Sequence, residues 1–340
     1  LEPDGAVRVD GGGNPIETYD NGDVTELAKV FTGLSWAARD SFLGAPQTLE
    51  SEYLPLVMFE SEHSPEPKSF LGTTIPANTP GDESIAMALD ALYNHPNTPP
   101  FISRQLIQRL VTSNPSRGYV GRVADAFRSG SFTLPDGSSV GDGVRGDMRA
   151  VVAAILLDAE ARDLSRIDDP NFGKLREPIL RFTHWARAFG VEETDTEDAR
   201  ILQDTSAPSR LGQQAYRSPS VFNFYRPGFV LPGSESAAAG LVAPELQITT
   251  GSSITGYANF MEGFIRQRVS DETYLPDYSD EIALAGDPAA LVDHLDGILT
   301  YGALGAESRT RIIQALNAIQ GDQNNGRDET RDAAAELMMM

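Results

Sequence analysis

The stretch Asp147-Met-Arg-Ala-Val-Val-Ala-Ala-Ile-Leu-Leu-Asp-Ala-Glu-Ala-Arg162 carries the clearest helical pattern of the chain. Its larger apolar residues recur at spacings of three and four, so we expect one face of a helix to lie in the core. The residues of that face are Met148, Val151, Val152, Ile155 and Leu156. Asp147, which precedes them, is expected to cap the first turn with its carboxylate.

Similar windows recur along most of the chain, separated by prolines and short polar turns. They cover 23–36, with a cap at Asp20 or Asn21, and then 85–93, 101–111, 119–127, 175–189, 249–269, 288–301, 308–319 and 327–340. Short connections favour antiparallel helical neighbours. The sequence therefore predicts a mainly α protein, an irregular helical bundle with two small β-hairpins and a long ordered crossing segment.

The two hairpins are predicted from alternating or short apolar runs beside turn residues. Residues 7–19 alternate around a glycine cluster, which is typical of a small hairpin. The apolar runs 53–59 and 69–75 flank a proline-rich turn, and we expect them to pair with each other.

The crossing segment begins with Ser218-Pro-Ser-Val-Phe-Asn-Phe-Tyr-Arg-Pro-Gly228 and continues to residue 248. It is rich in proline, glycine, alanine and aromatic residues, so we expect it to be extended and anchored in the core by its rings. On that expectation, Phe222→Ala costs about 3–5 kcal/mol of unfolding free energy.

We expect three regions within one domain. Residues 1–190 form the hairpin-decorated helical core, 191–248 an acidic loop and the crossing segment, and 249–340 C-terminal helices that pack on the same core. A helix ending in the apolar run from Leu337 to Met340 would lack cover, so the chain is expected to be a processed or partly ordered piece.

Charge and cysteine content exclude several classes of function. The 340 residues include 49 acidic and 27 basic side chains, and a net charge of −22 repels nucleic acid and anionic membranes. We therefore expect no nucleic-acid partner. The absence of cysteine removes disulfides, thiolate metal sites and thiol nucleophiles. No apolar run is long enough to predict a membrane span.

A dinucleotide-like motif, Gly141-Asp-Gly-Val-Arg-Gly146, stands before the helix that follows Asp147. Such glycines bring backbone onto a pyrophosphate only inside a βαβ unit, which needs a buried strand directly upstream. Here a turn, Leu134-Pro-Asp-Gly-Ser-Ser139, lies upstream. We therefore predict no nucleotide cofactor, and we find no Gly-x-Ser-x-Gly elbow for a serine nucleophile.

The four histidines, His63, His95, His184 and His294, lie in separate segments without the spacing that pairs two imidazoles on one helix. His63 is the strongest catalytic or metal-binding candidate, since Glu60, Glu62, Glu66 and Lys68 lie near it. A histidine beside carboxylates can serve as a general base or as a ligand of a divalent metal. More often such a residue fixes a hairpin by hydrogen bonding. No cofactor is predicted, and a metal at His63 stays an alternative.

Two arginine motifs are expected to act as structural pins. Arg176-Glu177-Pro178 and Arg226-Pro227 suggest buried or half-buried guanidinium groups that lock the crossing segment to the helices. Glu245 is a candidate partner for these arginines. The alternative for these arginines is substrate binding. If the protein is an enzyme, we expect His63 and Lys68 near the centre of its site, with Glu177 or Asp147 assisting.

Several stretches in order resemble a bacterial family, domain-of-unknown-function family 1800 (DUF1800). They are 18–33, 63–72, 95–96 with 101–104, 146–147 with 155–160, 176–178 and 218–228. The chain is similar to the C-terminal two-thirds of that family, whose pattern has an acidic residue where this sequence has Ser64. The resemblance implies a further helical segment in front of Leu1.

The resemblance also implies export, because members of the family typically carry leader peptides. Periplasmic, cell-surface or extracellular placement is therefore expected. A neighbouring exported protein related to alkaline phosphatases and sulfatases is implied as a partner, beside self-association or binding of the chain's own N-terminal segment. We expect a non-catalytic structural or assembly component. The alternative is a metal-dependent or histidine-based hydrolase whose site the missing N-terminal segment completes.

Overall fold

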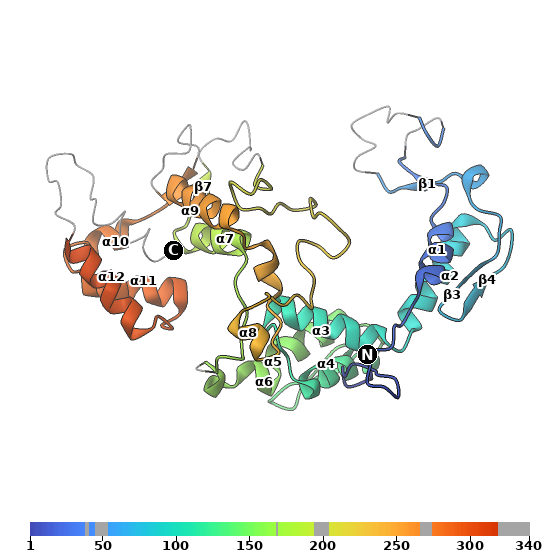
Figure 1. Cartoon of the computed structure of the whole chain (residues 1–340), viewed down its shortest axis with the longest axis horizontal. Coiled ribbons are helices and arrows are strands. Elements are labelled where there is room, and N and C mark those ends of the chain that lie inside the picture. The colour runs from blue at the N-terminus through green and yellow to red at the C-terminus, as the bar shows by residue number, and fades with distance from the viewer. Residues whose placement is uncertain (38–40, 45–53, 168, 194–203, 266–273, 319–340) are drawn as a thin grey trace. The chain divides into compact units, whose positions relative to one another are not determined.

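The computed structural model describes residues 1–37, 41–44, 54–167, 169–193, 204–265 and 274–318. Helices dominate these residues and their strands form small two-stranded sheets, so the predicted mainly α fold is confirmed (Figure 1). The chain divides into two compact units, Leu1–Leu110 with Pro115–Arg162, and Val111–Asn114 with Asp163–Met340. The boundaries expected at residues 190 and 248 stay predictions.

The elements follow one another in this order. In the first unit the helices are α1 (Asn21–Val30), α2 (Gly81–Asn94), α3 (Thr98–Leu110), α4 (Arg117–Ser129), α5 (Met148–Leu157) and α6 (Ala159–Arg162), with the 3-10 turn η2 (Glu60–Glu62). In the second unit they are α7 (Pro178–Ala188), α8 (Glu235–Ala238), α9 (Gly251–Ile265), α10 (Ser279–Leu284), α11 (Pro288–Leu295) and α12 (Ala306–Ala318), with 3-10 turns η3 (Leu164–Arg166) and η4 (Pro244–Ile248) and the π-helical turn η5 (Asp296–Thr300). The strands are β1 (Leu34–Ser35), β2 (Val57–Met58), β3 (Lys68–Phe70), β4 (Thr73–Ile75), β5 (Phe132–Thr133), β6 (Ser139–Val140), β7 (Glu192–Glu193) and β8 (Tyr274–Leu275).

Two helix starts carry the capping chemistry that the sequence indicated. The Asp20 carboxylate accepts hydrogen bonds from first-turn amides of α1, and Pro178 is the first residue of α7, where its missing N–H costs nothing. The predicted continuation of the first helix to Trp36 is wrong. The helix ends at Val30 and the chain turns at Gly33, whose φ is 84°.

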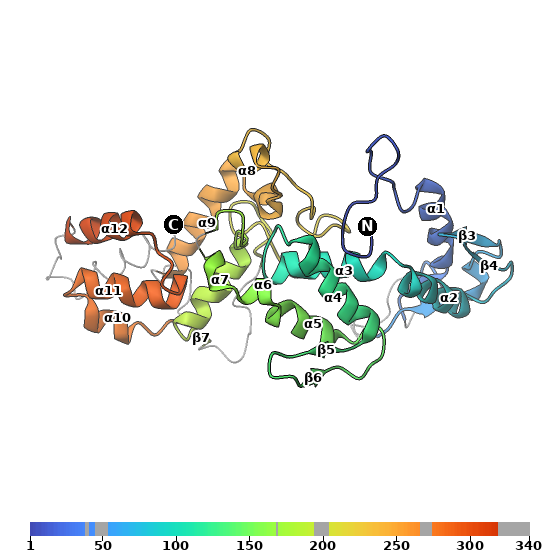
Figure 2. The same ribbon diagram turned by 90° about the horizontal axis from the view of Figure 1, so that it is seen from below.

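The strands pair differently from the prediction. β3 pairs with β4 and β2 pairs with β1, so the expected pairing of 53–59 with 69–75 is wrong. Leu71 and Gly72 have φ values of 47° and 73°, and this pair of left-handed residues forms the tight turn between β3 and β4. In the predicted N-terminal hairpin, one antiparallel bridge joins Val9 and Pro15. The β5–β6 hairpin was not predicted, and Figure 2 shows it beside α5.

The buried face of α5 differs from the predicted one. Its fully buried residues are Ala150, Val151, Ala154 and Ile155, whereas Met148, Val152 and Leu156 are 44%, 38% and 45% exposed. The predicted face is correct at Val151 and Ile155, and alanines occupy the other buried positions. Alanine allows α3, α4 and α5 to approach closely, and the Tyr119 hydroxyl of α4 donates to the Ile155 carbonyl at 2.5 Å.

The predicted helix 147–162 is also interrupted. Asp158 has an extended ψ of 144°, which ends α5 before α6 begins. Its side chain is 3% exposed and accepts two hydrogen bonds of 2.7 Å from the Nε and Nη2 of Arg122 on α4. A planar guanidinium fork matches a carboxylate in this way, so the break fixes α4 to the junction of α5 and α6.

Each unit has an apolar core of its own. In the first unit, Val30, Phe70, Ile75 and Ala88 join α1, β3, β4 and α2. In the second unit the core is rich in aromatic rings and comes from α7, α9, β8 and α10–α12. It contains Phe182, Trp185, Phe189, Leu211, Tyr257, Met261, Phe264, Ile265, Tyr274, Tyr278, Leu291, Val292, Leu295, Ile312 and Leu316.

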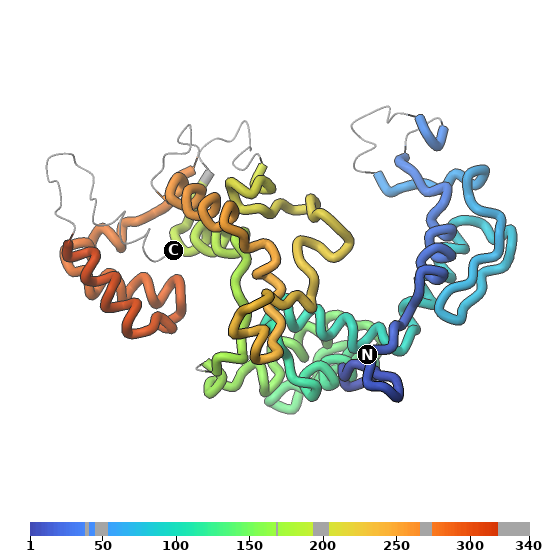
Figure 3. Tube along the Cα trace, in the orientation of Figure 1, coloured from blue at the N-terminus to red at the C-terminus, as the bar shows by residue number. Residues whose placement is uncertain are grey.

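Most of the residues from 204 to 248 lack regular structure, as the yellow part of the tube in Figure 3 shows. Tyr225 anchors this segment, because its ring is 3% exposed. Phe222 does not anchor it, since this side chain is 50% exposed. The expected loss of about 3–5 kcal/mol in unfolding free energy for Phe222→Ala assumed a buried ring, so that value no longer applies. Asn114 adds two hydrogen bonds to the backbone of Val242, at 3.0 and 2.9 Å.

Gly256 lets this segment approach α9 closely. A Cβ atom at this position would lie well inside van der Waals contact of the Pro208 carbonyl oxygen and of the Ser209 backbone. The glycine therefore positions the N-terminal half of α9 against residues 208–209.

Candidate functional site

His63 lies at the end of η2, and its ring is 7% exposed. Nδ1 is 2.9 Å from the carbonyl oxygen of Thr32, and Nε2 is 3.2 Å from the hydroxyl of Ser84 on α2. Since a carbonyl only accepts, Nδ1 is the donor to Thr32. The Ser84 hydroxyl lies within hydrogen-bond distance of both Nε2 and the Thr79 carbonyl, at 3.2 and 3.3 Å. The imidazole thus connects the end of α1, η2 and α2.

Lys68 on β3 is fully buried. Its ammonium donates to the backbone carbonyls of Ser64 and Glu66, at 2.9 and 3.3 Å, and so closes the turn before β3. Burial lowers the pKa of Lys68, and the nearby charge of Lys29 lowers it further. These contacts are separate from those of His63.

Asp147 is the N-cap of α5, as the sequence predicted. Its carboxylate accepts from the backbone amides of Arg149 and Asp142, at 2.8 and 2.9 Å, and pairs with the Arg149 guanidinium at 2.8 Å. The hydrogen bond from the Arg149 side chain holds the pKa of Asp147 well below its usual range, and the two amides add to this effect.

Glu177 precedes α7 in the second unit, so it belongs to a different unit from His63, Lys68 and Asp147. Its two carboxylate oxygens accept hydrogen bonds of 2.5 Å from the Gln213 amide and the Tyr225 hydroxyl. Glu177 thereby ties the crossing segment to the start of α7.

The two arginines are exposed rather than buried, contrary to the expectation. The Arg176 guanidinium is 3.0 Å from Nδ1 of His184 and lies over the ring of Tyr301. The Arg226 guanidinium lies over the ring of Phe222, 5.7 Å from its centre. Surface cation–π contacts contribute about 0.5–1 kcal/mol each.

Glu245 is buried, but its ion-pair partner is neither arginine. Its Oε1 lies 3.3 Å from the Lys174 ammonium, and the two side chains are 2% and 11% exposed. Among the described residues, its Oε2 has no hydrogen-bond partner although it is buried.

Within the first unit, His63, Lys68 and Asp147 use separate partners. Within the described ranges no group of three or more His, Asp or Glu side chains is arranged to hold a metal. The motif at 141–146 follows the β5–β6 hairpin instead of a strand of a βαβ unit.

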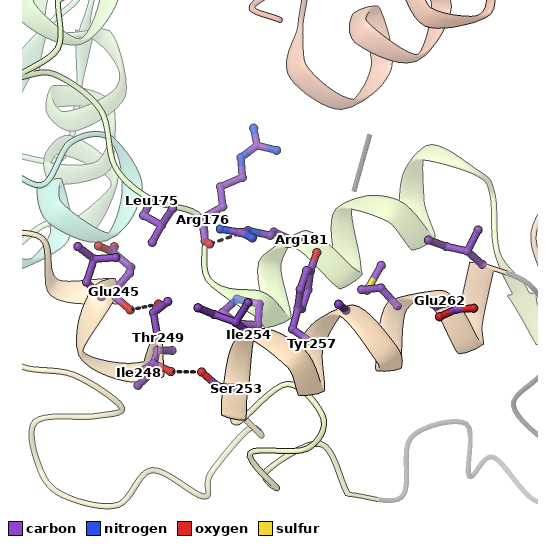
Figure 4. Close-up of a pocket in the computed structure, with 15 residues that line it drawn as sticks. Leu175, Arg176, Arg181, Glu245, Ile248, Thr249, Ser253, Ile254, Tyr257 and Glu262 are labelled. Atoms are coloured by element: carbon purple, nitrogen blue, oxygen red, sulfur yellow. Dashed lines mark hydrogen bonds between the residues drawn. The ribbon is translucent and has the colours of Figure 1, made fainter. Parts of the chain in front are cut away.

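Sequence reasoning missed a cavity of about 460 Å³ between the start of α7, η4 and α9 (Figure 4). Its lining comes from Leu175, Arg176, Pro178, Arg181, Glu245, Leu246, Ile248, Thr249, Ser253, Ile254, Tyr257, Ala258, Met261, Glu262 and Ile265. On α9 the lining residues recur at the three- and four-residue spacing of one helix face. That spacing also predicts an ordinary core face, so the pattern alone could not reveal a cavity.

No helix among the described residues has the length and hydropathy needed to cross a bilayer. Neither a curated protein nor a solved structure matches the chain. The profile of one family, described as "Protein of unknown function (DUF1800)", matches residues 7–340. The match covers nearly the whole chain, so the expected restriction to the C-terminal two-thirds was too narrow. The chain belongs to the DUF1800 family.

Proposed function

We propose that this chain is a non-catalytic structural or assembly component, exported to the periplasm, the cell surface or the medium. One observation carries the proposal: the side chains with the chemistry for catalysis are engaged in holding local structure. Lys68 closes a turn, Asp147 caps a helix and Glu177 ties two segments together.

His63 is also engaged in holding local structure. A general base must offer a lone pair within reach of a substrate proton. Both ring nitrogens of His63 already lie within hydrogen-bond distance of Thr32 and Ser84, which belong to the fold. No contact among the described residues favours the hydrolase alternative, so a single function is proposed.

Large exposed apolar side chains support self-association. In one short segment, Tyr216 and Val221 are fully exposed and Phe222 is half exposed. Exposed apolar groups that gather in one place mark protein interaction sites. A second copy of the chain is the proposed partner. The family resemblance adds an N-terminal segment and an exported phosphatase- or sulfatase-like protein, and it also supports export.

Light scattering across a range of protein concentrations tests the assembly role. The full chain should show a mass above that of the monomer, and the double variant Tyr216→Ser/Val221→Ser should lower that mass. Leu164→Ser is the matched control, since Leu164 is 79% exposed in the same unit but outside the segment. A monomer at all concentrations would refute self-association.

Elemental analysis of the native protein and fractionation of producing cells test the remaining parts. We expect no stoichiometric zinc, copper or iron, and recovery outside the cytosol. One bound metal per chain would replace this proposal with the metal-dependent hydrolase. Retention in the cytosol of cells that make the natural full-length protein would refute export.

A further inference from the structure

The cavity between α7 and α9 has the size and lining of a small-molecule site. Its volume of about 460 Å³ lies inside the range of roughly 300–1,000 Å³ that is typical of ligand pockets. Leu175, Ile248, Ile254 and Met261 give it an apolar surface, and Ile254 is 56% exposed. An apolar ligand would remove this surface from water, which favours binding.

Most hydrogen-bonding groups at the cavity are already engaged with one another. The hydroxyl of Thr249 donates to the Glu245 carbonyl, that of Ser253 to the Ile248 carbonyl, and Nε of Arg181 to the Arg176 carbonyl, at 3.2, 2.8 and 3.0 Å (Figure 4). The Arg181 guanidinium also lies over the Tyr257 ring, 5.4 Å from its centre. These groups form the wall of the cavity and already have hydrogen-bond partners within the protein.

Glu245 is the exception. Figure 4 shows it at the same end of the cavity as Leu175. It is 2% exposed, and its Oε2 has no hydrogen-bond partner among the described residues. A buried acceptor without a partner is costly, and a donor on a ligand would remove that cost. Because Lys174 already balances the carboxylate charge, the donor need not be a cation.

We propose that this cavity binds an uncharged, largely apolar small molecule that carries one hydrogen-bond donor, which Glu245 accepts. This inference goes beyond the assembly role and does not depend on it. The surface segment around Val221 takes no part in it, so the two proposals fail separately.

A fluorescent probe tests the proposal on the full chain. N-phenyl-1-naphthylamine is uncharged and apolar, has one N–H donor and becomes fluorescent when it leaves water. It should bind at one saturable site. Its N-methyl derivative lacks the donor and should bind about ten-fold more weakly, equivalent to about 1.4 kcal/mol. Equal affinity for the two probes would overturn the role of Glu245.

Two variants of α9 locate the bound probe. Ala258 lines the cavity and Asn259 is exposed outside its lining. Ala258→Phe fills the space and should abolish saturable binding, whereas Asn259→Phe should leave it unchanged. Binding that survives in Ala258→Phe would place the probe elsewhere and overturn the proposal.

A third variant isolates the acceptor. Lys174→Met/Glu245→Leu removes the ion pair as a unit and leaves neither charge unpaired. It should bind both probes with equal affinity. A preserved preference for the N–H probe in this variant would overturn the assignment. If this variant does not fold, the comparison of the two probes on the unaltered chain still decides it.

Discussion

At the scale of single residues, His63 illustrates a polar group that joins distant stretches of chain. Its partners Thr32 and Ser84 lie 31 and 21 positions away. Because these contacts join residues far apart in the sequence, they stabilise the first unit as a whole and not one loop alone.

His63→Ala should lower the free energy of unfolding by about 1–3 kcal/mol, since it removes two hydrogen bonds and buried packing. Denaturant titration of the full chain measures this loss. Glu62→Ala is the control, because its side chain is exposed on the same turn and should change stability by less than about 0.5 kcal/mol. An equal effect of both substitutions would contradict the bridging role of the imidazole.

Asp147 should make stability depend on pH in a defined direction. Its folded pKa is lowered by the hydrogen bond from Arg149, whereas an unfolded aspartate titrates at about 3.9. Its stabilising effect is therefore complete above about pH 4 and is lost as pH falls toward the folded pKa. Asp147→Asn should lower the denaturation midpoint at pH 7, and the difference from the unaltered chain should shrink by pH 3.

Asparagine also caps helices well, so this substitution changes mainly the charge. Asp90→Asn serves as the control on the exposed face of α2. A midpoint difference for Asp147→Asn that stays constant from pH 7 to pH 3 would show that the carboxylate charge is not the cause.

These two residues show what the sequence could reveal locally. The cap at Asp147 was predictable because it accepts from an amide only two residues away. The partners of His63 were not, since they depend on tertiary folding. The pairing of Glu245 with Lys174 instead of an arginine has the same origin: the two residues are 71 positions apart.

At the scale of elements, the crossing segment is anchored at Tyr225 rather than at Phe222. Tyr225→Ala should cost about 3–5 kcal/mol, because it removes a buried ring together with the hydroxyl that donates to Glu177. Phe222→Ala should cost about 1 kcal/mol or less, since that ring is half exposed and mainly covers Arg226. Thermal or chemical denaturation of both variants distinguishes them, and the reverse order would refute this anchoring.

Helices were easier to predict than strand pairs. Helical spacing, capping residues and first-turn prolines are local signals, and they located α2, α3, α4 and α7 closely. Strands of two or three residues carry little pattern of their own. The pairing of β1 with β2 also joins segments far apart in sequence, which a hairpin rule cannot anticipate.

At the scale of the whole molecule, the separate cores of the two units predict separate unfolding. Calorimetry should resolve two transitions. Ile107→Ala in the first unit and Leu291→Ala in the second should each destabilise only one of them, by about 2–5 kcal/mol, since both side chains are fully buried. One transition that shifts equally in both variants would show that the units unfold together.

Binding sites that depend on how several elements fold together were the hardest feature to predict from the sequence. The absence of cysteine excludes disulfides and thiol chemistry, because such a count needs no structure. The expected lack of a nucleic-acid partner stays a prediction. The cavity required the joint placement of η4, α7 and α9. The lining residues of α9 follow the spacing of an ordinary core face, so the pattern alone does not reveal the empty space beside them.

The close packing at Gly256 limits which residues position 256 can hold. Any larger residue there would force the Pro208 carbonyl away from α9, whereas Gly251 at the start of the same helix has open space around its missing Cβ. In a saturation library screened for soluble expression, position 256 should return glycine alone and position 251 a wide set of residues. At position 256 a neighbouring backbone atom, and not the helix itself, thus restricts which residue evolution can keep.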